Sequence, residues 1–186
     1  MRKILIVIDM QNDFIDGALG TAEAAAIVDN VINKIKSYPR EDVYATQDTH
    51  GEDYLETQEG RFLPVEHCIK GTPGWDIRPE IAELIEPSHI YEKPTFGSVG
   101  LAEEMKRIAE DEIIKGNLSD SADSAGIEIE IIGLCTDICV VSNALLLKAE
   151  MPEVKISVDP ACCAGVTPES HAAALATMQS CQIQMA

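Results

Sequence analysis

Short apolar runs alternate with longer amphipathic stretches along this chain, and this alternation constrains its fold more than any other feature. The runs are continuous and rich in Ile and Val, which is typical of strands buried on both faces of a sheet. Strands are predicted at Lys3–Ile8, Val43–Thr46, His89–Tyr91, Ile127–Ile132 and Val154–Val158. Apolar residues at spacings of three and four predict helices at Thr21–Ser37, Ile77–Ile85, Leu101–Ala109, Asp137–Ala149 and Pro168–Ser180. The prediction is an α/β fold, a mostly parallel β-sheet covered by helices on both faces.

Length and charge narrow the class of protein. The 186 residues are enough for one compact domain and too few for two of ordinary size, so we expect a single domain over residues 1–186. The formal net charge of −18 repels nucleic-acid phosphates and anionic lipids, so no nucleic acid and no membrane is expected as a partner. The first apolar run stops at Asp9, which is too early for a signal peptide. Six cysteines without a CxxC pair indicate free thiols, and we expect a cytoplasmic protein.

Chemically useful side chains follow three of the predicted strands, where ligands bind in sheets of this kind. Asp9 ends the first strand, and burial there would raise its pKa and make it a usable base. Lys93 leaves the third strand in a direction that the following proline restricts. Cys139 lies in the first turn of the next helix, whose dipole favours the thiolate, whereas the competing nucleophile Cys135 precedes that helix. Each also has an ordinary interpretation, as a turn carboxylate, a solvated lysine or a small buried thiol.

A second group of polar residues follows the second strand. Asp48 and His50 are two apart on an extended backbone and can face the same way, and Glu59 and His67 come later in the long aperiodic segment from residue 51 to residue 75. Ordered loops of that length are usually functional. Mixed nitrogen and oxygen ligands suit a divalent metal, zinc or else iron or manganese. The alternative is four unrelated loop residues that cap turns.

Five motifs in order resemble those of the isochorismatase-like cysteine hydrolases over nearly the whole chain, and within them those of the nicotinamidases. These motifs are Val7–Phe14, Thr46–His50, Pro64–Cys68, Lys93–Phe96 and Gly133–Val140. The resemblance implies a three-layer α/β/α fold and a homo-oligomer. It also implies hydrolysis of a small carboxamide, nicotinamide, to nicotinate and ammonia through a thioester intermediate.

The same resemblance assigns roles to residues. It implies a catalytic triad of Asp9, Lys93 and Cys139, and an oxyanion hole formed by the backbone amides of Cys135 and Cys139. It also implies a non-proline cis peptide between Leu134 and Cys135. The triad is the same three residues that the strand ends point to.

The resemblance further implies a metal site and a substrate pocket. Asp48, His50 and His67 match the metal ligands of similar nicotinamidases, with Glu59 in the fourth place and Glu56 as a weaker candidate. The ring of the substrate would pack on Phe14 and Trp75, although either could be an ordinary core residue; the ligand and pocket residues together are Phe14, Asp48, His50, Glu59, His67 and Trp75.

The chain also departs from the family pattern. The segment from residue 51 to residue 63 lacks the His-rich, Trp-containing pattern of many nicotinamidases, and Cys135 stands where many relatives have Ala. The segment Lys115–Gly126 looks like a solvated connection or a short irregular helix. Two alternatives stay open: a hydrolase of another small amide or enol ether, metal-free or of different specificity, and a catalytically silent member that binds a small molecule or a partner.

Overall fold

The computed structural model describes residues 1–116 and 126–186. Most of the predicted connection Lys115–Gly126 therefore lies outside the described residues, and its first two residues end a helix. In the described parts, no helix combines the length and the apolar character that a membrane span requires.

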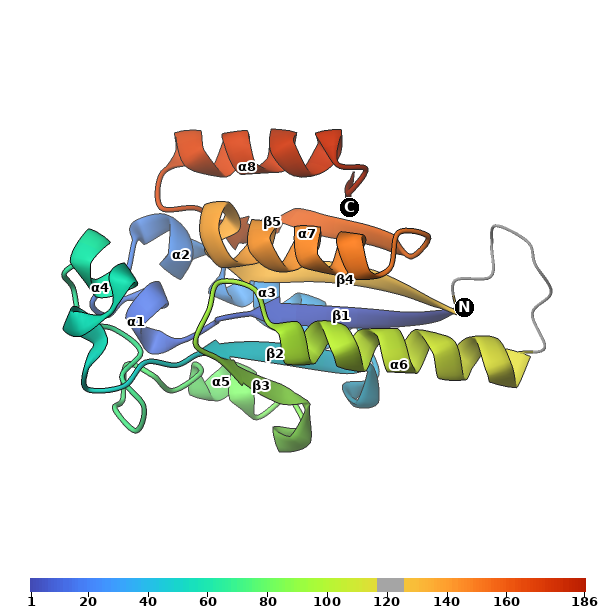
Figure 1. The fold of residues 1–186 in the computed structure, drawn as a ribbon, viewed down its shortest axis with the longest axis horizontal. Coiled ribbons are helices and arrows are strands. Elements are labelled where there is room, and N and C mark those ends of the chain that lie inside the picture. Colours follow the sequence, from blue (N-terminus) through green and yellow to red (C-terminus); the bar gives the residue numbers. More distant parts are fainter. Residues whose placement is uncertain (117–125) are drawn as a thin grey trace.

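A parallel sheet forms the centre of the molecule (Figure 1). Its strands follow the order β3-β2-β1-β4-β5-β6, with bounds β1 Arg2–Ile8, β2 Val43–Asp48, β3 Ile90–Lys93, β4 Ile127–Leu134, β5 Lys155–Ala164 and β6 Gln184–Met185. The five predicted strands are confirmed. The edge strand β6 was not predicted, because two residues are too few to produce a pattern; it pairs with β5 at Ser157 and Val158.

Helices cover both faces of the sheet, which confirms the predicted fold class. One face carries α6 (Val99–Gly116), α7 (Val141–Glu150) and α8 (Pro168–Ser180), and the other carries α2 (Ala22–Ala26), α3 (Val28–Ile35) and α5 (Pro79–Ala82) (Figure 1). At the carboxyl ends of the strands lie α1 (Asn12–Ile15), α4 (Gln58–Phe62), the 3-10 turn η2 (Tyr54–Glu56) and the π-helical turn η4 (Thr136–Val140). Two further 3-10 turns, η1 (Arg40–Asp42) and η3 (Pro87–His89), precede β2 and β3.

Four of the five predicted helices differ from the observed ones, and only Pro168–Ser180 has the same bounds. Leu101–Ala109 is the middle of the longer α6, and Asp137–Ala149 divides into the π-helical turn η4, which holds Cys139, and the helix α7. The stretch Thr21–Ser37 is broken at Ile27 into α2 and α3. The stretch Ile77–Ile85 contains the short α5, because Ile77 is held extended in an antiparallel bridge with Gln11 and the helix begins at Pro79. The antiparallel bridge ties the chain that follows Trp75 to the residues after β1, at the edge of the sheet where the candidate site lies.

The central strands form the core and fix the geometry of this edge. In β1 and β4 the apolar residues are almost completely buried, and Ile6 is in register with Tyr44 of β2 and Ile131 of β4. Gly133 has a φ of +117°, and a Cβ there would lie 2.1 Å from the carbonyl oxygen of Ile8. Because no side chain fits in that space, glycine allows the end of β4 to approach the end of β1.

Candidate active site

The side chains of Asp9, Lys93 and Cys139 lie close together at the carboxyl edge of the sheet. Each residue lies at or just after the end of a different strand. The Nζ atom of Lys93 lies 2.7 Å from Oδ2 of Asp9 and 3.5 Å from Sγ of Cys139. All three side chains are buried. The residues come from β1, β3 and the turn η4 after β4, so the parallel arrangement brings together groups that are far apart in sequence.

Asp9 is held as a buried base. It adopts a φ of +44°, a left-handed conformation that Asp tolerates better than most residues. The hydroxyl of Thr46 donates a hydrogen bond of 2.6 Å to Oδ1. Burial raises the pKa of the Asp9 carboxyl, and the positive charge of Lys93 opposes that shift. Oδ2 lies 2.7 Å from Nζ of Lys93, and the two groups form a buried ion pair.

Cys139 differs from the sequence prediction in its protonation. Burial raises the pKa of its thiol well above the ordinary value, and the Asp9 carboxylate adds to this, while Lys93 opposes it. Burial therefore works against the thiolate that the helix N-terminus was predicted to favour. If Cys139 acts as a nucleophile, the neighbouring Asp9 carboxylate is placed to accept its proton.

Lys93 joins this group to the neighbouring polar cluster. Its Nζ atom also lies 3.2 Å from Oδ1 of Asp48. Burial alone would lower the pKa of Lys93, but the charge of Asp9, with Cys139 and Asp48, raises it overall, so the ammonium stays charged between the two carboxylates. Burial alone would raise the pKa of Asp48, but His50 and Lys93 lower it overall, so this carboxylate stays ionised.

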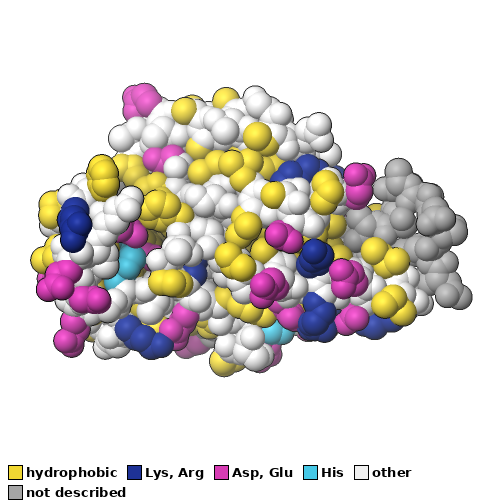
Figure 2. Space-filling view, viewed as in Figure 1, with side chains coloured by type: hydrophobic (Ala, Val, Ile, Leu, Met, Phe, Trp, Pro, Cys, Tyr) yellow, Lys and Arg dark blue, Asp and Glu magenta, His cyan; other side chains and the backbone are white. Residues whose placement is uncertain are grey.

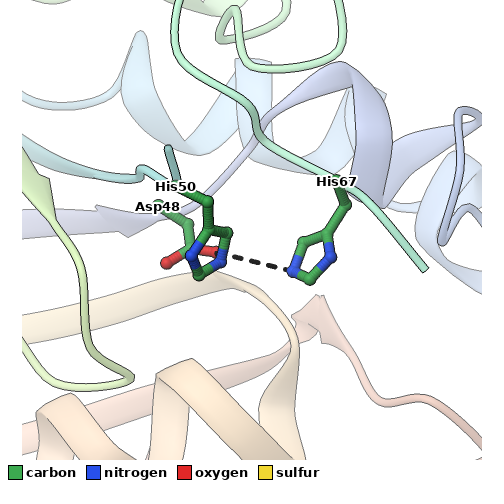
Figure 3. Close-up of side chains that lie close together, drawn as sticks. All are labelled: Asp48, His50 and His67. Atoms are coloured by element: carbon green, nitrogen blue, oxygen red, sulfur yellow. Dashed lines mark ion pairs between the residues drawn. The ribbon is translucent and has the colours of Figure 1, made fainter. Parts of the chain in front are cut away.

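Asp48, His50 and His67 form a buried cluster with the chemistry of a metal site, and Figure 3 shows the side chains facing one another. Their ligand atoms all lie within 4.8 Å of one another. Oδ2 of Asp48 is 3.0 Å from Nε2 of His50 and 3.8 Å from Nε2 of His67. Glu59 completes the group, since its Oε1 lies 3.7 Å from Nε2 of His50 and 3.8 Å from Nε2 of His67. The structure thus brings the four predicted ligands together.

Backbone pairing outside the main sheet brings the two histidines together. His50 and Ile69 form a parallel bridge, and the amide of His50 donates to the carbonyl of Cys68. The carboxylate of Asp13, in the first turn of α1, accepts from the amide of Cys68 at 2.8 Å. The chain around His67 is therefore fixed from two sides.

Glu59, the predicted fourth ligand, lies on α4, which packs against the turn η2 that carries Tyr54. Gly60 is needed there, because a Cβ would lie 2.1 Å from the carbonyl oxygen of Tyr54. The Tyr54 ring centroid is 4.7 Å from that of His50 and 4.9 Å from that of His67. This packing holds Glu59 over the cluster.

The hydrogen bonding of these residues leaves their ligand atoms available for a divalent cation. Nδ1 of His67 lies 2.9 Å from the carbonyl oxygen of Val65, so it donates there and leaves Nε2 as a lone-pair donor. Nε2 of His50 is buried and has no hydrogen-bond partner, although Oδ2 of Asp48 is 3.0 Å away. Buried polar atoms without hydrogen-bond partners are uncommon. A cation bound between Nε2 of His50 and Oδ2 of Asp48 would give both atoms a partner.

A cavity of about 530 Å³ opens onto both groups. In Figure 2 the surface at the left end is hollowed, with a histidine (cyan) visible in the hollow and hydrophobic side chains (yellow) beside it. The described lining comprises Phe14, Leu19, Asp48, Gln58, Glu59, Phe62, Leu63, His67, Pro94, Thr95, Phe96, Cys135, Ile138 and Cys139. Phe14 lies where the sequence predicted it.

Trp75 was predicted to line this pocket, and that prediction is wrong. Its indole Nε1 donates to the hydroxyl of Thr49 at 2.9 Å, and its carbonyl accepts from the side chains of Gln11 and Gln47. Its ring lies under the ammonium of Lys70. Trp75 therefore packs against the chain after β2 and is not among the described residues that line the cavity.

Comparisons with known proteins agree with this geometry. A family model described as the isochorismatase domain matches residues 3–186. The chain belongs to the isochorismatase family.

Three individual proteins illustrate the likeness. The nicotinamidase/pyrazinamidase of Mycobacterium tuberculosis is 26% identical over 190 residues, which covers 98% of this chain and 97% of that protein. The crystal structure of the Bacillus subtilis nicotinamidase/pyrazinamidase PncA superposes with a TM-score of 0.76 at 26% identity and covers 100% of both chains. The pyrazinamidase of Pyrococcus horikoshii in complex with zinc gives a TM-score of 0.73 at 25% identity over 100% of this chain and 99% of that one.

This isochorismatase family protein has two further site features, one that the resemblance implied and one that the sequence did not reveal. The peptide bond between Leu134 and Cys135 is cis, as the resemblance implied. The buried side chain of Asn143, one turn into the helix after Cys139, had not been considered: its Nδ2 donates to the carbonyl of Cys139 at 2.8 Å and to that of Phe96 at 3.1 Å, and its Oδ1 accepts from the amide of Ser98 at 2.9 Å. A polar residue at an otherwise apolar helix position was the available signal.

Proposed function

We propose that this protein is a cysteine amidohydrolase that converts nicotinamide to nicotinate and ammonia. The observation that carries the proposal is the buried group of Asp9, Lys93 and Cys139 next to the Asp48, His50 and His67 cluster, with Cys139, Asp48 and His67 lining one cavity. The similarity to proteins named nicotinamidase/pyrazinamidase supports action on an amide. The substrate is the finer part of the proposal.

The triad supports a two-step reaction. Sγ of Cys139 attacks the carboxamide carbon while its proton moves to Oδ2 of Asp9. The proton then passes to the leaving nitrogen, the C–N bond breaks, and ammonia leaves a thioester on Cys139. Water attacks the thioester with Asp9 again accepting a proton, the C–S bond breaks, and the thiol regains its proton as the carboxylic acid departs.

The negative charge that develops on the carbonyl oxygen must be stabilised by hydrogen-bond donors. Backbone amides of Cys135 and Cys139 are the candidates, and each such donor typically contributes about 3 kcal/mol to lowering the barrier. Lys93 stabilises the Asp9 carboxylate and the developing negative charge on the sulfur at a distance of 3.5 Å. A divalent cation held by Asp48, His50, Glu59 and His67, with zinc the first candidate, would supply Lewis acidity beside the substrate ring.

A direct assay tests this function. Purified protein incubated with nicotinamide should release nicotinate and ammonia in equal amounts, measured by chromatography and an enzyme-coupled ammonia assay. If the protein releases ammonia from another small amide and none from nicotinamide, it is a hydrolase of the same family with a different substrate. Binding without turnover of any amide would favour the catalytically silent alternative.

Asn143→Ala should lower kcat by about 10-fold to 100-fold, because Asn143 ties the Cys139 carbonyl to the loop after Lys93, and small misplacements of reacting groups are costly. Three hydrogen bonds are lost, two of them buried, so the free energy of unfolding should also fall, by about 1–3 kcal/mol. Steady-state kinetics and denaturant unfolding measure the two effects.

The control is Asn30→Ala, since Asn30 makes a hydrogen bond of 2.8 Å to the carbonyl of Ala161 in an exposed setting. A positioning role predicts a larger fall in kcat than rise in KM for Asn143→Ala, with both parameters nearly constant in the control. A loss of stability with unchanged kcat would mean that Asn143 has a structural role alone.

A further inference from the structure

The cavity is larger than one aromatic ring requires. Roughly 150 Å³ is sufficient to hold benzene inside a protein, whereas this cavity measures about 530 Å³. Volumes of several hundred Å³ are typical of pockets for molecules with more than one ring. A nicotinamide molecule placed against Cys139 would therefore leave much of the cavity unfilled.

The burial of the lining residues divides the cavity into an inner and an outer part. The inner part contains the buried side chains of Phe14, His67 and Cys139. The outer part contains three large apolar side chains that remain exposed: Phe62 is 84% exposed, Phe96 is 47% exposed and Leu63 is 37% exposed. We call these three residues the outer apolar rim.

The rim is assembled from separate segments of chain, which indicates a feature of tertiary structure. Phe62 ends α4 and Leu63 follows it, whereas Phe96 lies in the loop after β3. Exposed apolar groups that border a cavity commonly mark a binding surface. Because these side chains line the same cavity as Cys139, a molecule held by the nucleophile can reach them.

The charge of the lining restricts what the outer part accepts. Among its described residues the cavity has two acidic side chains, Asp48 and Glu59, and no Lys or Arg. Lys93 is buried behind Asp9 and Asp48 and pairs with both. At the rim itself Phe62, Leu63 and Phe96 offer a negatively charged substituent no cation, so the rim favours an uncharged apolar group, whatever charge a metal ion held by the Asp48 cluster adds deeper in the cavity.

We propose that the outer apolar rim of Phe62, Leu63 and Phe96 binds an uncharged apolar substituent of the substrate, so that this enzyme prefers aromatic carboxamides larger than nicotinamide. The inference rests on the proposed amidohydrolase function and names the class of substrate for the same site. The carboxamide lies at Cys139 and the substituent, on the far side of the ring, covers the rim.

Three amides test this preference: nicotinamide, and two derivatives with either a phenyl or a carboxylate group on the ring carbon meta to the carboxamide. The kcat/KM of the phenyl derivative should exceed that of nicotinamide by about tenfold or more, since burial of one ring on apolar side chains provides at least that factor. The carboxylate derivative should be the poorest of the three. The ratio of kcat/KM between the phenyl derivative and nicotinamide is the quantity compared among variants.

Phe62→Ala should lower this ratio by at least about fivefold, because it removes the more exposed of the two phenyl rings of the rim. Leu55→Ala is the matched control: Leu55 is 48% exposed in the neighbouring turn η2 and is not among the described residues that line the cavity. The control should keep the parent ratio. Phe96→Ala provides an independent variant from the other segment if Phe62→Ala is poorly folded.

The outcomes separate this inference from the proposed function. If nicotinamide is hydrolysed and the phenyl derivative is no better, the rim is not a substrate subsite and the proposed function stands. If no amide is hydrolysed, the proposed function fails, and calorimetric binding to Cys139→Ala decides the subsite: binding of the phenyl derivative at least tenfold more tightly than nicotinamide supports it, and equal binding overturns it. A Phe62→Ala protein with an unchanged ratio but a smaller oligomer by light scattering would identify the rim as a contact between copies.

Discussion

Cys139→Ala is expected to abolish hydrolysis of nicotinamide, with kcat reduced by a factor of about 10⁴ or more, because the covalent step has no other nucleophile in position. The loss should not come from unfolding. Removal of one buried sulfur atom should cost about 1 kcal/mol of unfolding free energy, and Ala suits the turn that begins the helix. Steady-state ammonia release, with circular dichroism as the check on folding, measures both effects.

Cys135→Ala is the matched control for this prediction. Both thiols line the cavity, but the proposed role of Cys135 uses its backbone amide, so the alanine variant should retain most of the activity. If Cys135→Ala is inactive and Cys139→Ala is active, the nucleophile has been assigned to the wrong residue. Activity in both variants would mean that hydrolysis does not use a cysteine.

The pH dependence of alkylation examines the same site by another route. Burial and the Asp9 carboxylate raise the pKa of Cys139, so the reactive thiolate is scarce at neutral pH and increases as the pH rises toward the shifted value. Labelling of Cys139 by iodoacetamide, followed by peptide mapping, should therefore become faster throughout the alkaline range, and nicotinamide should slow it. A labelling rate that is already constant from neutral pH upward would show a thiolate in the free enzyme.

Loss of either histidine of the cluster is the second large effect. The parent protein should contain about one divalent metal ion per chain, because four nitrogen and oxygen ligands converge. His50→Ala and His67→Ala should both lower the metal content, and kcat/KM should fall by at least about 10-fold to 100-fold, the loss that follows even from removal of a ligand's outer hydrogen-bond partner. Elemental analysis after dialysis gives the metal content.

His89→Ala is a histidine control far from this cluster. His89 stacks on Tyr44 with ring centroids 4.1 Å apart and lies near the carbonyl of Val43 at the start of β2. Its removal should leave metal content and kcat/KM unchanged. Treatment with a chelator should lower the melting temperature of the parent and leave that of His67→Ala unchanged, since bound metal stabilises the folded state. Metal content that stays at the parent level in both cluster variants would refute the ligand assignment.

The strands and the groups at their ends could be predicted because both are local properties of the sequence. An unbroken apolar run such as that of β1 predicts a buried strand, and the residue after it must lie at the carboxyl edge. Parallel strands all end at the same edge, so Asp9, Lys93 and Cys139 could be grouped without any coordinates. The boundaries of α5 and the strand β6 could not, because a bridge to a distant residue and a pairing of two residues leave no periodic pattern.

The order of the elements, the fold class and the identity of the polar residues at the edge of the sheet all follow from local patterns in the chain. The walls of the cavity and the direction of the pKa shifts within it depend on contacts between distant segments. Trp75 lies outside the described lining of the cavity, whereas Phe62 and Phe96 are part of it. The direction of a loop side chain depends on what packs around it. The raised pKa of Cys139 has a related reason: the dipole at a helix terminus can be read from the chain, but the burial of the thiol comes from neighbours contributed by other strands.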